Sequence, residues 1–130
     1  MTDKLIIGLV DGANYQKQFI EILFLTIFPN KKIIIKLKLQ EEPDYLVYST
    51  FGEEHIKYKN CYKILINIKS TNLKEYKPDF IIDTTNDVKH IPENANMVYI
   101  PHYVLSFYER FRNVPNSLIK SSDYNSEQIL

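Results

Sequence analysis

Short apolar runs, each followed by a turn signal, recur along this chain and limit its fold more than any other feature. The first, residues 5–10, is continuous and leads into Asp11 and Gly12, a pattern typical of a buried strand at the centre of a parallel sheet. Similar runs occupy residues 45–49, 62–68, 80–83 and 97–100. Parallel neighbours need a crossover between them, and the intervening segments can supply one. We therefore predict an α/β fold: a single Rossmann-like, doubly wound, mostly parallel sheet flanked by helices.

A helix is predicted directly after the first strand. Phe19, Leu23 and Ile27 recur at helical spacing, Asn14 is placed to cap the helix, and Pro29 ends it. Further apolar side chains in this segment make the apolar surface of the predicted helix wider than the single face that Phe19, Leu23 and Ile27 would form. Two interpretations remain open: burial against the sheet alone, or an additional exposed surface for docking.

Three further elements complete the prediction. Residues 31–39 begin with isoleucines and then alternate with lysines, which predicts a half-exposed strand at the sheet edge. A short helix is expected to end at Tyr76, with Ser70 or Thr71 as its cap. A last helix is expected over residues 103–111, and its apolar face is assigned to the core: Val104, Phe107, Tyr108 and Phe111.

The chain has 130 residues, the size of one domain. Residues 113–130 are polar and lack a periodic apolar pattern, so they are predicted to be a tail after an α/β domain of residues 1–112. Lys and Arg number 16 and balance 16 Asp and Glu. Charge therefore gives no reason to expect a nucleic acid or an anionic membrane as partner.

Cys61 is the only cysteine, which excludes an intrachain disulfide and fits a reducing compartment. We expect its thiol to be inert and packed. The N-terminus shows no signal-peptide pattern, and no apolar stretch approaches the roughly 20 residues that span a bilayer. We expect a cytoplasmic protein. The excess of Lys over Arg is typical of an AT-rich genome, and for a viral source the location would be the host cytoplasm.

Polar side chains gather where the predicted strands end. In an open α/β sheet, ligands bind outside the carboxyl ends of the strands, so these residues predict a single ligand-binding rim. The candidate binding residues are Asp11, Asn14, Thr50, Phe51, Gly52, Glu53, His55, Lys69, Ser70, Asn72, Asp83 and Asp87.

Some rim residues also have a structural interpretation. His55 is either a loop histidine that is hydrogen-bonded to backbone or a ligand contact. Asp83 and Asp87 either form turns or bind ligand hydroxyls. Gly52 is predicted to supply a positive φ.

Neither a cofactor nor a metal is predicted. His90 and His102 lack partners at metal-ligand spacing. Gly8 and Gly12 do not form a G-x-G-x-x-G motif, and no P-loop is present. A receiver-like phosphoacceptor domain would need an acidic pair after the first strand and an aspartate after the third. In this chain Asp11 is the single acidic residue directly after the first strand, and the third predicted strand is followed by Ser49-Thr50 and not by an aspartate.

Residues 43–58 carry a longer motif, in which a Pro-Asp-Tyr strand runs into Phe-Gly-x-Glu-His-x-x-Tyr. This motif resembles the acceptor-side, N-terminal half of the α-1,3-fucosyltransferases of glycosyltransferase family 10. Residues 61–67, 77–83 and 99–103 resemble later segments of that family in the same order. The resemblance implies one Rossmann-like half of a GT-B glycosyltransferase, the half that binds the acceptor sugar.

The same resemblance argues against activity. In that family a strand ending Gly-Glu-Asn supplies the proposed catalytic base, whereas the matching strand here ends Ile68-Lys69-Ser70, without a carboxylate. No catalytic residue is therefore assigned. Glu53, Glu54 and His55 remain as alternative proton acceptors, although the resemblance gives their loop an architectural role.

These observations lead to two functional expectations. The first is a fucosyltransferase-like acceptor domain that is not catalytic alone and acts as a carbohydrate-binding or protein-binding module or a degenerate remnant. The second is the acceptor half of a split α-1,3-fucosyltransferase, completed by a separate donor-domain chain. The expected partners are a glycan acceptor and, through apolar helix faces, a donor-domain protein or a second copy of the chain.

Overall fold

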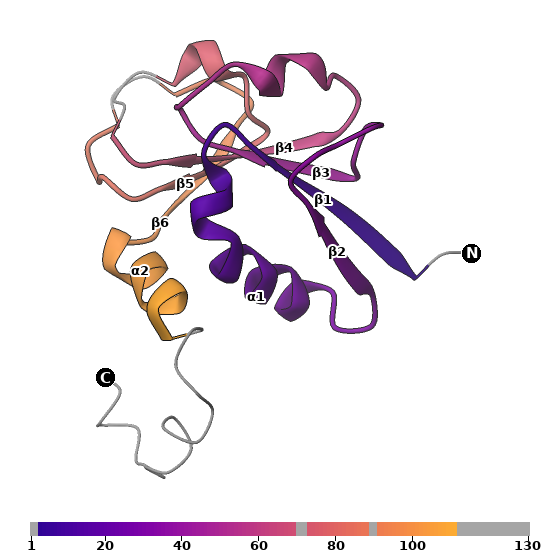
Figure 1. Ribbon diagram of the computed structural model, residues 1–130. Coiled ribbons are helices and arrows are strands. Elements are labelled where there is room, and N and C mark those ends of the chain that lie inside the picture. The colour runs from indigo at the N-terminus through magenta and orange to yellow at the C-terminus, as the bar shows by residue number, and fades with distance from the viewer. Residues whose placement is uncertain (1–2, 70–72, 89–90, 112–130) are drawn as a thin grey trace, which may run out of the picture.

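The protein folds around one six-stranded sheet, in which every neighbouring pair is parallel. The computed structural model describes residues 3–69, 73–88 and 91–111 (Figure 1). The strand order is β2-β1-β3-β4-β5-β6. The predicted α/β, Rossmann-like fold is therefore confirmed. The strands are β1 Lys4–Val10, β2 Lys32–Lys36, β3 Tyr45–Tyr48, β4 Tyr62–Asn67, β5 Phe80–Asp83 and β6 Asn96–Tyr99.

The two edges of the sheet are β2 and β6. The edge position of β2 confirms the prediction for residues 31–39, but the strand is shorter than expected and ends at Lys36. Beyond it Leu37 is 51% exposed, while Leu39 turns in over Gly8. The alternation of apolar and charged residues after Lys36 thus reflects a segment that leaves the sheet.

A Pro-Asp pair stands before each of two strands and fixes where it begins. The Asp44 carboxylate, ahead of β3, accepts the backbone N–H of Ile6 in β1 at 2.8 Å. The Asp79 carboxylate, ahead of β5, accepts the N–H of Lys63 in β4 at 2.9 Å. Proline has no N–H to donate and suits the entry of a strand. Each aspartate then supplies an acceptor for the neighbouring strand.

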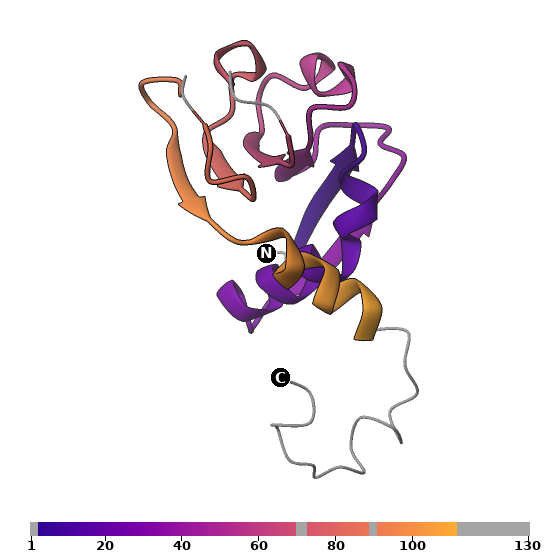
Figure 2. The same cartoon turned by 90° about the vertical axis from the view of Figure 1, so that its left-hand side faces the viewer.

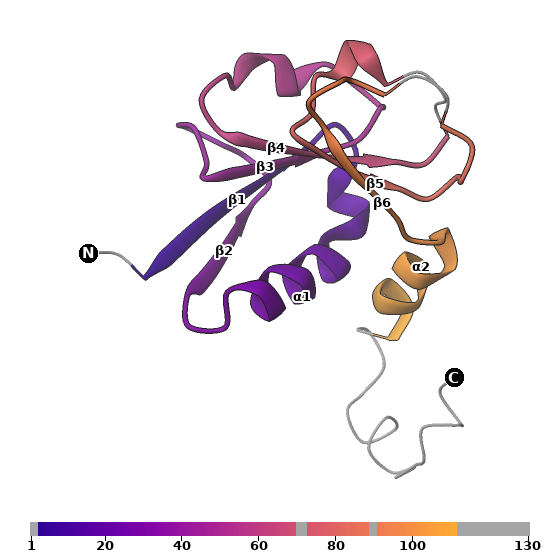
Figure 3. The same ribbon diagram turned by 180° about the vertical axis from the view of Figure 1, so that it is seen from behind.

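The helices divide between the two faces of the sheet. The α-helices α1 (Lys17–Ile27) and α2 (His102–Phe111) lie on one face and pack against each other (Figures 1 and 2). On the opposite face, the described residues form the short 3-10 helices η2 (Glu54–Lys57) and η3 (Lys74–Tyr76), with their loops (Figure 3). The N-cap of η3 is Leu73, so the cap predicted at Ser70 or Thr71, which lie outside the described residues, is wrong. The predicted tail, residues 113–130, also lies outside the described residues.

The predicted cap of the first helix is wrong. Asn14 lies exposed within a separate 3-10 helix, η1 (Ala13–Gln16), which precedes α1. The left-handed conformation of Gly12, φ 93°, starts this turn two residues before the expected cap, Asn14. Gln16 stands at the N-cap of α1 without a side-chain bond.

Two apolar clusters form the core, one on each face. The helix-side cluster joins α1 to the sheet through Phe19, Ile20 and Phe24, with the fully buried Leu105 of α2. The opposite cluster is built on Leu46, Tyr48, Leu65 and Ile81. None of the helices in the described ranges is long and apolar enough to cross a bilayer.

Candidate functional site

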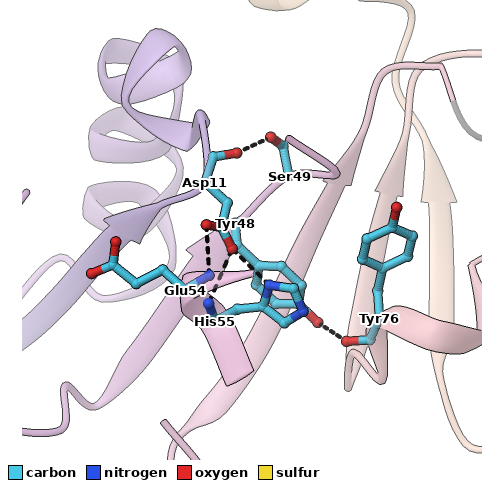
Figure 4. A network of polar contacts seen from close by, with 6 residues as sticks. All are labelled: Asp11, Tyr48, Ser49, Glu54, His55 and Tyr76. Atoms are coloured by element: carbon cyan, nitrogen blue, oxygen red, sulfur yellow. Dashed lines mark hydrogen bonds and ion pairs between the residues drawn. The ribbon is translucent and has the colours of Figure 1, made fainter. Parts of the chain in front are cut away.

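The candidate site lies at the switch point of the sheet. β2 pairs with β1 on one side, whereas β3 to β6 extend on the other, so successive crossovers diverge between β1 and β3. Ligands of open α/β proteins bind at such a point, outside the carboxyl ends of the strands. Asp11 follows β1 and Ser49 follows β3, and the Ser49 hydroxyl donates a hydrogen bond to the Asp11 carbonyl (Figure 4).

Asp11 is the centre of the rim. It adopts a left-handed backbone conformation, φ 55°, which turns the chain sharply at the end of β1. One carboxylate oxygen accepts the backbone N–H of Glu54 at 2.9 Å, and the other accepts that of His55 at 3.0 Å. The second oxygen also lies 2.6 Å from Nδ1 of His55. One side chain thus anchors a loop 44 residues further along the chain.

The His55 ring is held on several sides. It is 3% exposed and stacks on the Tyr48 ring, with 4.3 Å between centroids and 13° between planes. The Tyr76 ring lies tilted at 6.0 Å. Among the described residues, the side chain is bonded to the Asp11 carboxylate and not, as one of its two interpretations predicted, to backbone. The other interpretation, a ligand contact, stays a prediction.

Tyr48 links this site to η3. Its hydroxyl donates to the backbone carbonyl of Tyr76 at 2.6 Å. Burial, followed by the charges of Asp79 and Asp11, raises the pKa of Tyr48 well above that of free tyrosine. The phenol therefore stays protonated and keeps its role as a donor.

Two glycines make room for this arrangement. A Cβ on Gly12 would lie 2.7 Å from the Phe51 ring, and one on Gly52 would lie 2.6 Å from an Asp11 carboxylate oxygen. Gly12 has a positive φ, but Gly52 does not, so the predicted reason for Gly52 is wrong. Gly52 is needed for the close approach of the carboxylate.

A polar cavity of about 370 Å³ opens beside His55. It is lined by Thr50, Gly52, Glu53, His55, Ile56, Glu75 and Tyr76. The Thr50 hydroxyl is buried and has no hydrogen-bond partner among the described residues. A second cavity of about 280 Å³ shares four of these residues: His55, Ile56, Glu75 and Tyr76. Buried polar atoms are normally paired, so the Thr50 hydroxyl is an exception at the rim.

The rest of the predicted rim falls into separate groups. The Lys69 amine lies 5.3 Å from the centre of the Phe51 ring, which packs over Gly12. Asn14 is exposed on η1, and Asp87 is exposed in the loop after β5. Ser70 and Asn72 lie outside the described residues.

The buried Asp83 is committed to its own turn, as one of its two interpretations predicted. Its carboxylate accepts the Asn67 amide at 2.9 Å, the Thr85 hydroxyl at 2.8 Å and the Asn86 N–H at 2.8 Å. These protein donors occupy both oxygens of the carboxylate.

The sequence analysis did not identify four residues of the site: Tyr48, Ile56, Glu75 and Tyr76. Tyr48 belongs to the apolar run of β3. Its spacing of two residues from Leu46 places both side chains on the same face of the sheet, but it does not reveal that Tyr48 stacks on His55. Glu75 and Tyr76 belong to η3, whose position over β3 depends on the whole fold. In the described part of the chain, no group of three His, Cys, Asp or Glu side chains is arranged to hold a metal.

The comparison with known families gives this geometry its context. The family model of the alpha-(1,3)-fucosyltransferase FucT N-terminal domain matches residues 9–108. The chain belongs to this family. The match includes every described candidate residue, from Asp11 to Asp87, and confirms the resemblance carried by residues 43–58. No curated protein and no solved structure matches the chain.

For a fucosyltransferase N-terminal domain, the Phe-Gly-x-Glu-His segment now has a structural explanation. Glu54 and His55 supply the N–H groups, Gly52 supplies the space, and Asp11 supplies the carboxylate that joins them. The segment is architectural, and it also holds one imidazole at the wall of the cavity.

Proposed function

We propose that this fucosyltransferase N-terminal domain binds the acceptor sugar of a fucosyl transfer and does not transfer fucose by itself. The observation that carries the proposal is the polar cavity between the segment after β3 and η3, in a chain that belongs to this family. Fucose donor binding is then the task of another domain.

The chemistry of the cavity suits a polyhydroxylated ligand. Sugar hydroxyls need hydrogen-bond partners when they leave water, and the wall offers the Thr50 hydroxyl, the His55 ring and the Glu53 and Glu75 carboxylates. Tyr76 adds an aromatic surface. A volume of about 370 Å³ is at the lower end of ligand pockets, which suits one or two sugar rings.

Binding can be tested with N-acetyllactosamine as the probe, by saturation-transfer difference NMR and titration. We expect saturation of the sugar protons by the wild-type chain. Thr50→Val keeps the side-chain shape and removes the hydroxyl, so it should weaken the affinity about tenfold. Leu25→Ala, at an exposed position on α1, is the matched control and should bind as the wild type does. A wild-type chain that gives no saturation transfer contradicts the proposal.

The second half of the proposal concerns transfer. The purified chain is expected to leave GDP-fucose and N-acetyllactosamine unchanged, as followed by mass spectrometry of the sugar. Formation of the fucosylated trisaccharide by the chain alone would overturn this part.

The alternative function, the acceptor half of a split fucosyltransferase, is favoured by a different feature. An apolar cavity of about 480 Å³ lies between the carboxyl-terminal half of α1 and strands β3 to β6. Ile27, at its wall, is 56% exposed. An exposed apolar surface on this helix is what a partner chain requires.

A tagged chain from its native source tests this alternative. The expected result is retention of a GDP-binding chain that restores fucose transfer in the mixture, and loss of both effects in Ile27→Glu. Ile27→Val is the control that keeps the surface apolar. If no retained chain restores transfer, the split-enzyme alternative is wrong, and light scattering then shows whether a second copy covers the surface.

A further inference from the structure

His55 keeps one polar atom unused. Its Nδ1 is bonded to Asp11, whereas its Nε2 has no hydrogen-bond partner among the described residues. We infer that His55 is the general base of this cavity: its Nε2 takes the proton of the acceptor hydroxyl, and Asp11 positions the ring. This inference rests on the proposed function, because it needs an acceptor sugar in the cavity.

Asp11 selects the tautomer of the ring. Its carboxylate oxygen already accepts the His55 backbone N–H, and it can only act as an acceptor toward Nδ1 at 2.6 Å. In the neutral ring the single proton therefore lies on Nδ1, and the lone pair lies on Nε2. A histidine held through one nitrogen by a carboxylate is the arrangement that frees the other nitrogen for proton transfer.

The orientation of the ring is also fixed. The stack on Tyr48 prevents rotation out of the plane, and the hydroxyl of Tyr48 is itself bonded to η3. Figure 4 shows the second ring nitrogen pointing away from Asp11, toward the side of Tyr76. His55 and Tyr76 line both cavities on this side. A base that is already oriented needs little rearrangement when the hydroxyl arrives.

The carboxylates of the cavity are less suitable. Glu53 and Glu75 contribute to its wall, but both residues are exposed, so water and rotamer freedom compete with a fixed position. His55 is 3% exposed and has no such freedom. Thr50 lines the same wall, and its hydroxyl has no hydrogen-bond partner among the described residues.

The step balances as an inverting transfer. The acceptor hydroxyl oxygen forms a bond to the anomeric carbon of a sugar-nucleotide donor while the bond from that carbon to the phosphate oxygen breaks. The hydroxyl proton moves to Nε2, and the electron pair of the broken bond leaves with the nucleoside diphosphate. The resulting imidazolium is stabilised by Asp11. The donor is held by a separate donor-binding domain.

Two substitutions separate the ring nitrogens. His55→Asn places an amide N–H near the position of Nδ1, which keeps a donor for Asp11 and removes Nε2. His55→Gln places its amide near Nε2 and serves as the reciprocal variant. Affinity is measured for N-acetyllactosamine and for its analogue without the 3-hydroxyl of N-acetylglucosamine, and amide NMR spectra check that each chain is folded.

We expect Nε2 of His55 and the 3-hydroxyl of N-acetylglucosamine to depend on each other for their contribution to the affinity. The wild type should bind the parent sugar about tenfold more tightly than the deoxy analogue, and His55→Asn should bind both equally. His55→Gln should restore part of the difference. The ¹⁵N resonance of Nε2 in the wild type should also move when the parent sugar is added, which a purely structural histidine would not show.

The outcomes separate the two proposals. A tenfold difference that persists in folded His55→Asn overturns the general base and leaves sugar binding intact. An Nε2 resonance that stays fixed while the sugar binds has the same meaning, and this measurement decides the question if His55→Asn does not fold. A wild type that binds neither sugar overturns sugar binding and the general base together.

Discussion

At the scale of the residue, Asp11 couples the end of β1 to the rim loop. Its carboxylate accepts the N–H groups of Glu54 and His55 and lies against Nδ1 of His55. The side chain is 4% exposed, so water cannot readily replace these contacts. Removing the carboxylate would leave buried donors without an acceptor, which costs more than the hydrogen bonds themselves contribute.

Asp11→Ala is therefore expected to lower the free energy of unfolding by about 2–4 kcal/mol. Asp11→Asn keeps one acceptor oxygen and should cost less. Urea denaturation followed by circular dichroism measures both, with Asp87→Ala, in an exposed loop, as a control that should change stability by less than about 0.5 kcal/mol. If Asp11→Ala is as stable as the control, the carboxylate does not hold the loop.

At the scale of the element, α2 closes the helix side of the sheet. It follows β6 and packs on α1, and its Leu105 is 0% exposed within the helix-side core. Tyr103, two positions earlier, is 74% exposed. The side chains of residues 108–111 are outside the described part, so Leu105 is the clearest anchor of this helix.

Leu105→Ala should destabilise the domain by about 2–5 kcal/mol, because the deletion leaves a cavity between α1 and α2. Tyr103→Ala on the same helix should have a small effect, within about 1 kcal/mol. Thermal and urea unfolding compare the two. Equal effects would mean that α2 contributes through its surface and not through Leu105.

The elements that were predicted correctly are those whose signal is local. The runs at β1, β3, β4 and β5 are apolar because both faces of a central parallel strand are buried, and the sequence pattern records this directly. The end of β2 and the start of α1 were wrong because they depend on single backbone choices at Lys36 and Gly12. Such choices leave no periodic signal.

The candidate site was predictable only in part. Asp11 and His55 were placed on one rim by the rule for strand ends, but their bond joins residues 44 positions apart and needs the actual sheet order. The stack of Tyr48 on His55 and the approach of η3 are likewise tertiary contacts. The binding roles of the rim residues remain predictions.

At the scale of the whole molecule, folding raises the pKa of a thiol and a phenol that lose their protons at alkaline pH in the unfolded chain. Burial, together with the charge and hydrogen bond of Glu42, raises the pKa of the Cys61 thiol to about 11. Burial and neighbouring carboxylates also raise the pKa of Tyr48. Both groups are neutral when protonated, so the fold favours the protonated forms.

The sign of the pH effect follows from the two states. Below about pH 8, thiol and phenol are largely protonated in both the folded and the unfolded chain, and stability does not depend on them. Above that pH the unfolded chain releases the thiol proton first and then, near about pH 10, that of the tyrosine, while the folded chain still holds both. Proton release stabilises the unfolded state, so stability must fall as pH rises.

The domain is thus expected to lose stability steadily between about pH 8 and pH 11 and to show a plateau between about pH 6.5 and pH 7.5. Urea unfolding at fixed temperature across this range measures the slope. Cys61→Ala removes the thiol and should flatten the first part of the decline, whereas Tyr48→Phe should flatten the later part after its lower starting stability is subtracted. A slope that is the same in the wild type and in both variants would show that other groups, such as surface lysines that lose their charge, control the alkaline limit.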